Sequence, residues 1–278
     1  MKKIVLTGIK DFKADHIFEC GQCFRWNREG DDYVGVADGY VAKVHFDDAP
    51  GDDVGGTLTL EVSGGDEAFW SHYFDLNTDY GRIKSDIIAR EPQIAIACES
   101  GYGIRILNQD MFETLISFIV SQNNNIPRIK KCIESICEHY GEYLGEYFGR
   151  KRYAFPTARA LADASPCELA ELKLGYRCEY ISASARQYLA EGSPTSYEQI
   201  LSYHGIGPKV ANCIMLFGLH KVDAFPIDTW VKHIMNDMYG FDEKDVKGMA
   251  AFAADKFGAS AGYAQQYLFH YYRNVKFT

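Results

Sequence analysis

The hydrophobic pattern of this chain changes period near Asp110, and this change limits the folds that the chain can adopt. Before that point, residues 57–62 alternate polar and apolar side chains, as a half-buried strand does. After it, five apolar residues recur at helical spacing and form one face of a helix: Phe112, Leu115, Ile116, Ile119 and Val120. A β-rich part should therefore precede a helical part.

The first hundred residues are predicted to form antiparallel β structure. Residues 33–37 and 40–46 flank Asp38-Gly39, a dipeptide typical of the primed turns that close β-hairpins. Residues 50–56 are rich in Gly and Asp and are expected to form a loop. These signals predict a hairpin, a loop and then the strand at residues 57–62.

The remainder of the chain is predicted to be helical. Asp110 and Glu113 resemble a capping box that begins the first helix. Further helical stretches are expected near residues 127–140, 157–163, 166–173, 180–190, 196–203, 208–219, 228–238, 244–257 and 260–273. We therefore predict an α+β fold, with an antiparallel β-rich N-terminal domain over residues 1–108 and a helical body over residues 109–278.

Composition excludes several classes of protein. No stretch approaches the roughly 18 uninterrupted apolar residues that a membrane span needs. The start of the chain turns polar by Lys10 and Asp11, too soon for a secretion signal. Eight cysteines in this length do not form a disulfide framework and favour a reducing compartment. We expect a cytoplasmic protein, associated with the nucleoid if its source is bacterial.

The net charge of −9 argues at first against a nucleic-acid partner. Residues 1–110, however, contain 11 Lys and Arg against 20 Asp and Glu and so carry the whole of the −9, whereas residues 111–278 contain 18 of each. Anion binding therefore belongs to the second part, through local placement of charge. The acidic first part is expected to face away from such a partner or to touch little of it.

Residues 201–211 contain a Gly-x-Gly turn at Gly205 and Gly207, and Pro208 follows directly. A short helix should end before the turn, and Pro208 should open the next helix, where its missing N–H costs little. Such a hairpin exposes backbone N–H groups beside a helix N-terminus, which suits an anion such as phosphate. A tight corner between two packed helices would explain the same residues equally well.

Two further residues favour catalysis. Lys209 falls in the first turn of the new helix, where the positive end of the helix dipole is expected to lower its pKa. A neutral lysine amine is a nucleophile that can form a Schiff base. Asp228 ends a Pro-x-Asp motif, where it would also cap the following helix. Capping and catalysis are compatible, because a cap holds the carboxylate rigidly.

Taken together, the hairpin, the lysine and the Pro-x-Asp resemble the helix-hairpin-helix, Gly/Pro-Asp superfamily of DNA base-excision glycosylases. Further matches narrow the resemblance to the 8-oxoguanine DNA glycosylase/AP lyase family: Gly21-Gln22-Cys23-Phe24-Arg25-Trp26, Ser121-Gln122-Asn123-Asn124-Asn125-Ile126, Leu174-Gly175-Tyr176-Arg177 and Ser182-Ala183-Ser184-Ala185-Arg186. The matches extend from about residue 20 to residue 269 and so cover nearly the whole chain.

The resemblance implies a catalytic pair and a contact to the damaged base. Lys209 would attack the anomeric carbon, and Asp228 would stabilise the positive charge that develops on the sugar. The backbone carbonyl of Gly21 would accept the N–H at position 7 of 8-oxoguanine, where guanine has an acceptor instead. Without the resemblance, Gly21 is simply a turn residue.

The remaining pocket residues are also implied by the resemblance. Cys213 and Phe269 would lie on either side of the flipped base, and Gln265 would bond its Watson–Crick edge. From helical spacing alone, ordinary core packing explains Cys213 and Phe269 better.

On the DNA, the resemblance implies four further contacts. Asn123 would fill the hole left by the flipped base, and Tyr176 would wedge beside the estranged partner base. Arg128 and Arg177 would converge on that base when it is cytosine, although both would also suit phosphate binding. Taken alone, the three consecutive asparagines would indicate only a polar turn.

At the hairpin, N–H groups near Gly205 and Gly207 would bind DNA phosphate. The resemblance also implies a site for a monovalent or calcium ion, formed by backbone carbonyls near Leu201, Tyr203 and Ile206. No organic cofactor is required.

The cysteines do not predict a metal or cluster site. No iron–sulfur cluster is expected, because the sequence after Lys209 lacks four clustered cysteines. Cys20 and Cys23 form a Cys-x-x-Cys, but no second pair of Cys or His completes a zinc site.

The predicted protein is a monomeric, bifunctional enzyme that acts on double-stranded DNA containing 8-oxoguanine, preferentially opposite cytosine. Trp230 departs from the family pattern, since histidine is expected there in eukaryotic members, near the DNA backbone. An alkylated-purine glycosylase is one alternative, but such enzymes usually lack the hairpin lysine. A silent helix-hairpin-helix DNA-binding protein is another, and it would leave Lys209 and Asp228 unexplained.

Overall fold

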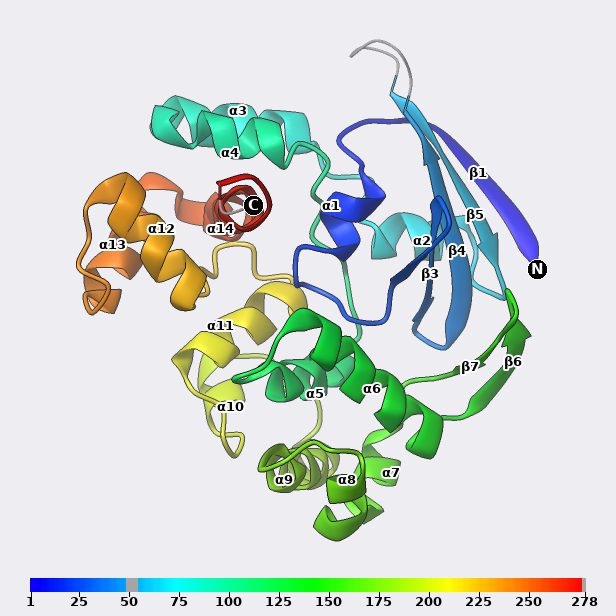
Figure 1. Ribbon diagram of the computed structural model, residues 1–278. Helices are drawn as coiled ribbons and strands as arrows, with labels where there is room; N and C mark the ends of the chain where they lie inside the picture. Colours follow the sequence, from blue (N-terminus) through cyan, green and yellow to red (C-terminus); the bar gives the residue numbers. More distant parts are fainter. Residues whose placement is uncertain (49–54, 277–278) are drawn as a thin grey trace.

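The computed structural model describes residues 1–48 and 55–276 and consists of a sheet on one side and a helical body on the other (Figure 1). The sheet is antiparallel with strand order β1-β5-β4-β3-β2. Its strands are β1 (Lys2–Ile9), β2 (Asn27–Glu29), β3 (Asp32–Ala37), β4 (Tyr40–Asp47) and β5 (Gly56–Val62). The predicted antiparallel N-terminal sheet is therefore confirmed, and β1 and β2 are strands that sequence patterns did not predict.

The predicted hairpin is formed by β3 and β4, with Ala37 paired to Tyr40. Asp38 and Gly39 have φ angles of 50° and 78°, as a primed turn requires. The strand predicted at residues 57–62 is β5, whose alternate side chains are buried in the core of the sheet domain. The loop predicted at residues 50–56 lies mostly outside the described residues.

The prediction of β structure throughout the first hundred residues is wrong after residue 66. This part contains α2 (Glu67–Tyr73), α3 (Tyr80–Arg90) and α4 (Ala95–Ser100), and the shorter α1 (Ala14–Phe18) precedes them in the chain. Asp66 and Asp79 cap α2 and α3, because their carboxylates accept N–H groups at 2.8 and 2.9 Å. These two caps were the sequence signal that was missed.

The body contains the predicted series of helices. They are α5 (Met111–Ser121), α6 (Ile126–Tyr140), α7 (Ala158–Asp163), α8 (Pro166–Glu171), α9 (Arg177–Glu191), α10 (Tyr197–Leu201), α11 (Pro208–Phe217), α12 (Thr229–Tyr239), α13 (Val246–Lys256) and α14 (Ala261–Tyr271). A small hairpin of β6 (Tyr143–Tyr147) and β7 (Arg150–Tyr153) was not predicted.

The start of α5 shows only half of the predicted capping box. Asp110 accepts the N–H of Glu113 at 2.8 Å. The Glu113 carboxylate, however, lies 3.8 Å from Nη1 of Arg25, and burial raises the pKa of Glu113 to about 7. The glutamate is therefore used to pair a buried arginine of the first part of the chain and does not close the cap.

Helices α3 and α4 precede the predicted boundary at residue 108 but pack with the body. Figure 1 shows both beside α14, which carries two of the predicted pocket residues, and α4 contacts α14 extensively. Ile87, Ile94 and Ala97 belong to the same buried cluster as the body helices. The two parts of the chain thus share a core behind the site. Among the described residues, no helix is long and apolar enough to cross a membrane.

Candidate active site

A small cavity between α11, α14 and the loop after α1 contains all six residues predicted for catalysis and base binding. Its volume is about 50 Å³, and its lining includes Gly21, Lys209, Cys213, Asp228, Gln265 and Phe269. This volume is well below the roughly 300–1,000 Å³ of small-molecule sites, so a purine can enter only if the cavity widens. Five further lining residues were not predicted as site residues. Cys20 and Pro226 belong to motifs noted in the sequence, whereas no local pattern marks Phe118, Phe217 and Gln266.

The predicted hairpin connects α10 to α11. Gly205 has a φ of 80°, and a Cβ atom there would lie 2.4 Å from the ring of Tyr180. Only glycine fits this position, because both the backbone angle and the close contact exclude a side chain. Gly207 is the N-cap of α11, and Pro208 is its first residue, as expected. Tyr180, on which the hairpin rests, was not predicted.

Lys209 lies in the first turn of α11 with its Nζ 5.9 Å from the centre of the Phe118 ring. The expectation of a lowered pKa is wrong. The Cys213 sulfur raises the pKa of Lys209 above its usual value, burial opposes this, and the Asp228 carboxylate adds to the rise. The side chain is therefore an ammonium in the free protein at neutral pH.

Asp228 is the N-cap of α12. Its Oδ1 accepts the N–H of Val231 at 2.8 Å, which fixes the carboxylate at the mouth of the cavity. Capping and a place in the site therefore coexist in one residue. Trp230, two residues further on, is 39% exposed and lines the groove that leads to Asp228.

Gly21 is held in place by its neighbour Gln22, which is 1% exposed. The Gln22 amide nitrogen donates to the carbonyls of Ile17 at 3.0 Å and Arg105 at 2.7 Å, and its oxygen accepts the N–H of Leu107 at 2.9 Å. Gly21 itself has a φ of 80°, which glycine adopts without strain. Gln22 belongs to the family motif at residues 21–26, but its anchoring role was not predicted.

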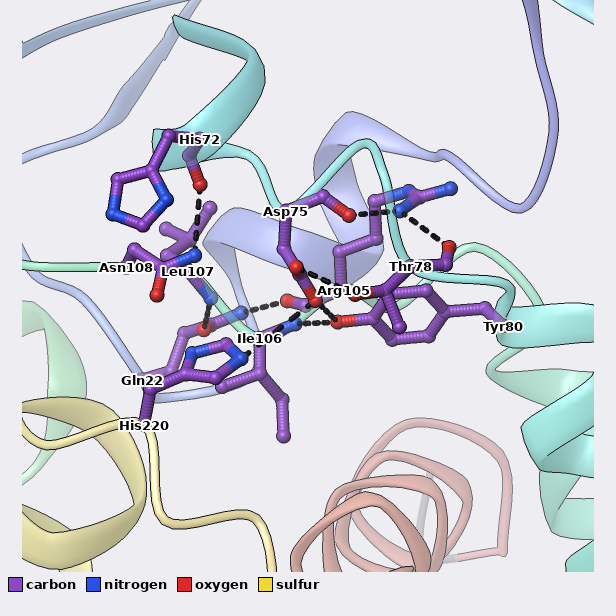
Figure 2. A network of polar contacts seen from close by, with 10 residues as sticks. All are labelled: Gln22, His72, Asp75, Thr78, Tyr80, Arg105, Ile106, Leu107, Asn108 and His220. Atoms are coloured by element: carbon purple, nitrogen blue, oxygen red, sulfur yellow. Dashed lines mark hydrogen bonds and ion pairs between the residues drawn. The ribbon is translucent and has the colours of Figure 1, made fainter. Parts of the chain in front are cut away.

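Figure 2 shows the network to which Gln22 belongs. The Arg105 guanidinium donates to the backbone carbonyl of Asp75 and lies 4.5 Å from the centre of the Tyr80 ring. The Tyr80 hydroxyl donates to the Asp75 carboxylate at 2.8 Å and accepts the N–H of Ile106 at 2.8 Å. These buried contacts make the segment that supports the Gly21 loop rigid.

Gln265 and Phe269 lie one turn apart on α14. Gln265 is buried, and its side-chain oxygen accepts from the amide of Gln266 at 2.7 Å. Phe269 is half-buried against the Gly21 loop, where a Cβ atom on Gly21 would lie 3.8 Å from its ring. The aromatic ring lines both the cavity and the groove that adjoins it.

The cysteines around the cavity are thiols at neutral pH. Burial raises the pKa of Cys213, and burial raises that of Cys20 to about 11. Within the described parts of the chain, no three His, Cys, Asp or Glu side chains lie together as a metal site would need. Of the three hairpin carbonyls expected to hold an ion, that of Tyr203 accepts the N–H of Ile206 at 3.1 Å.

Two grooves lead away from the cavity over α6. The nearer, of about 340 Å³, joins Gly21, Lys209 and Asp228 to Asn124 and Asn125. The second, of about 820 Å³, contains five basic residues beside two acidic ones: Arg128, Lys130, Lys131, Arg150 and Arg273, with Glu19 and Glu134. Positive charge is thus gathered next to the site in a chain that is acidic as a whole.

Asn123, Tyr176 and Arg177 lie together at the end of α5, outside the cavity. Asn123 and Tyr176 are exposed, and Nδ2 of Asn123 donates to the Tyr176 hydroxyl at 3.1 Å. The Arg177 guanidinium, in contrast, is buried against backbone carbonyls. Arg128 lies apart from this group on the first turn of α6, where it is exposed. In the free protein the two arginines therefore lie in different surroundings, one buried against backbone carbonyls and the other exposed on α6.

The fold and site define a base excision repair protein of the helix-hairpin-helix class, and comparison with known proteins agrees. The family model for the 8-oxoguanine DNA glycosylase N-terminal domain matches residues 4–115. The model for HhH-GPD superfamily base excision DNA repair proteins matches residues 116–258. The chain belongs to the 8-oxoguanine DNA glycosylase family within this superfamily, and it is an N-glycosylase/DNA lyase.

Similar proteins come from several kingdoms. The N-glycosylase/DNA lyase of Saccharomyces cerevisiae is 32% identical over 255 residues, which cover 81% of this chain and 67% of the yeast protein. The N-glycosylase/DNA lyase of Arabidopsis thaliana is 30% identical over 277 residues, which cover 91% of this chain and 75% of the plant protein. The 8-oxoguanine glycosylase/lyase of Clostridium acetobutylicum, solved with double-stranded DNA containing cytosine opposite 8-oxoguanine, is 38% identical, with a TM-score of 0.89 over 99% of this chain and 96% of that chain.

Proposed function

We propose that this enzyme removes 8-oxoguanine from double-stranded DNA through a Schiff base on Lys209 and then nicks the abasic strand. The observation that carries the proposal is the shared cavity, in which Lys209 and Asp228 meet the pocket residues Gly21, Gln265 and Phe269. Family membership supports the substrate class, and the half-buried lysine and aspartate that line one cavity support the chemistry.

The proposed reaction begins with loss of a proton from the Lys209 ammonium, since only the free amine is a nucleophile. The amine then bonds to the anomeric carbon as the glycosidic bond breaks, and the base leaves with the bonding electron pair and gains a proton. Asp228 stabilises the positive charge on the sugar. Opening of the sugar ring gives a Schiff base, and loss of a proton from the adjacent carbon expels the 3′ phosphate by β-elimination.

Discrimination against guanine is assigned to the Gly21 carbonyl. It accepts the N–H at position 7 of 8-oxoguanine, whereas normal guanine offers an acceptor that would face it unpaired. Support comes from the rigid anchoring of the adjacent Gln22, because a discriminating acceptor must not move to suit the wrong base. Cys213 and Phe269 would enclose the faces of the base, and Gln265 would bond its Watson–Crick edge.

Preference for cytosine opposite the lesion is assigned to Arg128 and Arg177, of which Arg128 is exposed on α6 and lines the basic groove. Asn123 and Tyr176 would enter the duplex beside the estranged base. The N–H groups of the hairpin would bind phosphate, and the carbonyls of Leu201, Tyr203 and Ile206 would hold a monovalent or calcium ion that balances phosphate charge there.

Borohydride trapping on three duplexes tests this proposal. The reagent reduces a Schiff base to a stable amine, so a covalent protein–DNA adduct is expected with 8-oxoguanine opposite cytosine and none with guanine opposite cytosine. The third duplex carries 3-methyladenine. Adduct or base release only with that duplex would favour an alkylated-purine glycosylase, and binding without release of any base would favour a silent DNA-binding protein.

A further inference from the structure

Gln266, the residue after Gln265 on α14, is a buried amide beside the candidate catalytic pair. The residue is 3% exposed, and it lines the same cavity as Lys209 and Asp228. Its Nε2 donates to Oε1 of Gln265 at 2.7 Å. Its own Oε1 is buried and accepts no hydrogen bond from any part of the chain that the structure describes.

This unpaired oxygen calls for a physical explanation, because native proteins leave few buried polar groups without a partner. Three aromatic rings of the cavity lining, those of Phe118, Phe217 and Phe269, carry no donor. The Cys20 thiol, also on the lining, donates to the carbonyl of Ile17 at 3.2 Å. A donor group of a ligand in the cavity would therefore meet a free acceptor and displace no protein contact.

The bond between the two glutamines also sets which atom of Gln265 can serve a ligand. An amide oxygen has two lone pairs, and the Gln266 amide occupies one of those on Gln265. One acceptor position then remains on Oε1 of Gln265, and a second acceptor is the unpaired Oε1 of Gln266. The two adjacent side chains thus offer a pair of acceptors.

The Watson–Crick edge of 8-oxoguanine presents a matching pair of donors, the N–H at position 1 and the amino group at position 2. We propose that Gln266 is a specificity-determining residue, whose Oε1 accepts the 2-amino group while Oε1 of Gln265 accepts the N–H at position 1. The inference rests on the function proposed above and adds a second reader of the base, away from the Gly21 carbonyl.

A second reader is needed because the contact at Gly21 does not identify guanine. An adenine oxidised at position 8 also has an N–H at position 7, so the Gly21 carbonyl would accept it equally well. That base has an acceptor at position 1 and no amino group at position 2, and both glutamine oxygens would then be buried without a donor. Rejection by unpaired polar groups is a strong form of discrimination.

The test compares two bases that differ only in the 2-amino group, 8-oxoguanine and 8-oxohypoxanthine, each placed opposite cytosine. Gln266→Met keeps a similar size and removes the acceptor oxygen. The single-turnover excision ratio of 8-oxoguanine to 8-oxohypoxanthine should be lower in Gln266→Met than in the wild type by about fivefold or more, as for one lost hydrogen bond in a buried site. The weaker pairing of 8-oxohypoxanthine in the duplex affects both proteins equally and cancels.

Gln93→Met is the matched control, because Gln93 is exposed on the short helix η1 (Pro92–Ile94), away from the cavity. It should excise both bases at the wild-type rates. An unchanged or higher ratio in Gln266→Met would overturn the inference, even if both rates fall, because Gln266 would then only support Gln265. Each ratio comes from one preparation and does not depend on the folded fraction. Failure of the wild type to excise 8-oxoguanine would instead refute the function proposed above.

Binding gives a second measurement that does not depend on the chemical step. In a Lys209→Gln background, which lacks the amine, both duplexes remain intact while their dissociation constants are measured. Adding Gln266→Met should weaken binding of the 8-oxoguanine duplex by about fivefold more than binding of the 8-oxohypoxanthine duplex. Equal weakening of the two would show that the 2-amino group is not read by Gln266 and would overturn the inference.

Discussion

Lys209 and Cys213 lie one turn apart on the same face of α11, and both side chains line the same cavity. The sulfur and the Asp228 carboxylate raise the lysine pKa although burial lowers it, so the resting state of the nucleophile is protonated. Burial raises the pKa of the Cys213 thiol as well, which leaves that group neutral at pH 7. Attack therefore requires removal of a proton from Lys209 after substrate has bound.

The first prediction concerns this nucleophile. Lys209→Gln keeps a similar size but removes the amine, so folding and DNA binding should persist while strand cleavage and borohydride trapping are lost. Lys221→Gln, which changes an exposed lysine after α11, is the control and should trap like the wild type. Wild-type trapping by Lys209→Gln would place the nucleophile at another residue.

Asp228→Asn separates electrostatics from capping. Asparagine still accepts an N–H at the N-cap, so stability should change little, but the charge that faces the developing cation is lost. We expect excision to fall by about 10²-fold, equivalent to ~3 kcal/mol, as for other single stabilising groups.

The control for Asp228→Asn is Asp245→Asn, because Asp245 caps α13 in the same way, accepting the N–H of Gly248 at 2.9 Å. Its excision rate should equal that of the wild type. If Asp228→Asn also excises at the full rate with an unchanged melting temperature, Asp228 has no part in the mechanism.

Local patterns predicted the catalytic pair because each member carries its own signal. Lys209 follows a Gly-x-Gly-Pro turn, and Asp228 ends a Pro-x-Asp that also caps a helix. Gln265 and Phe269 have no such signal, since α14 meets the Gly21 loop only through tertiary packing. Family resemblance alone identified them.

The wrong expectation for the pKa of Lys209 has a physical cause. The direction of the pKa shift was assigned from the local helix dipole, but it is set by Cys213 and Asp228, and Asp228 is brought near by tertiary structure. The position of the Arg177 guanidinium in the free protein likewise depends on a tertiary contact, because it donates to backbone carbonyls at the end of α5. Local sequence patterns carry neither piece of information.

The third prediction concerns the salt dependence of DNA binding. With no basic excess over residues 111–278, binding should use hairpin N–H groups and a few side chains of the basic groove. We expect a log–log slope of about −3 to −4.5, which corresponds to roughly three to five phosphates. Lys131→Ala in the groove should reduce the slope by about 1. A wild-type slope near −8 would reveal a further basic surface, because each phosphate contact contributes roughly −0.9 to the slope.

Stability should decrease below pH 6.5 because of a buried histidine pair. The rings of His16 on α1 and His270 on α14 lie 4.5 Å apart, and both residues are buried. Burial, followed by the charge of His270, lowers the pKa of His16 from 6.5 to about 4, and burial also lowers that of His270. Between pH 6.5 and 4 the unfolded chain binds protons that the folded chain does not. The free energy of unfolding therefore decreases as the pH decreases through this range.

Urea unfolding at pH 7 and pH 5 measures this effect, and His16→Phe should reduce the loss. His45 is the control, because its protonation should have the opposite effect on stability. Hydrogen bonds to the carboxylates of Asp32 and Asp47 raise its pKa, so protonation of His45 stabilises the fold. His45→Gln should therefore leave the decline intact or make it steeper. An equal decline in wild type and His16→Phe would exclude the histidine pair as its cause.

The last prediction concerns the base opposite the lesion. Arg128 is exposed on the first turn of α6, where its backbone N–H is bonded to the Asn125 cap at 3.1 Å and its side chain lines the basic groove. If the guanidinium donates to O2 and N3 of the estranged cytosine, adenine loses or strains these bonds at about 1–3 kcal/mol each. The wild type should then strongly prefer 8-oxoguanine opposite cytosine, and Arg128→Ala should raise relative excision opposite adenine with little change in the salt slope.

Lys131→Ala, one turn further along the same helix, is the matched control. It should lower the salt slope without changing the ratio of excision opposite cytosine to excision opposite adenine. If Arg128→Ala instead weakens binding to every duplex equally and lowers the slope by about 1, Arg128 binds phosphate; equal wild-type rates opposite cytosine and adenine would refute the preference itself.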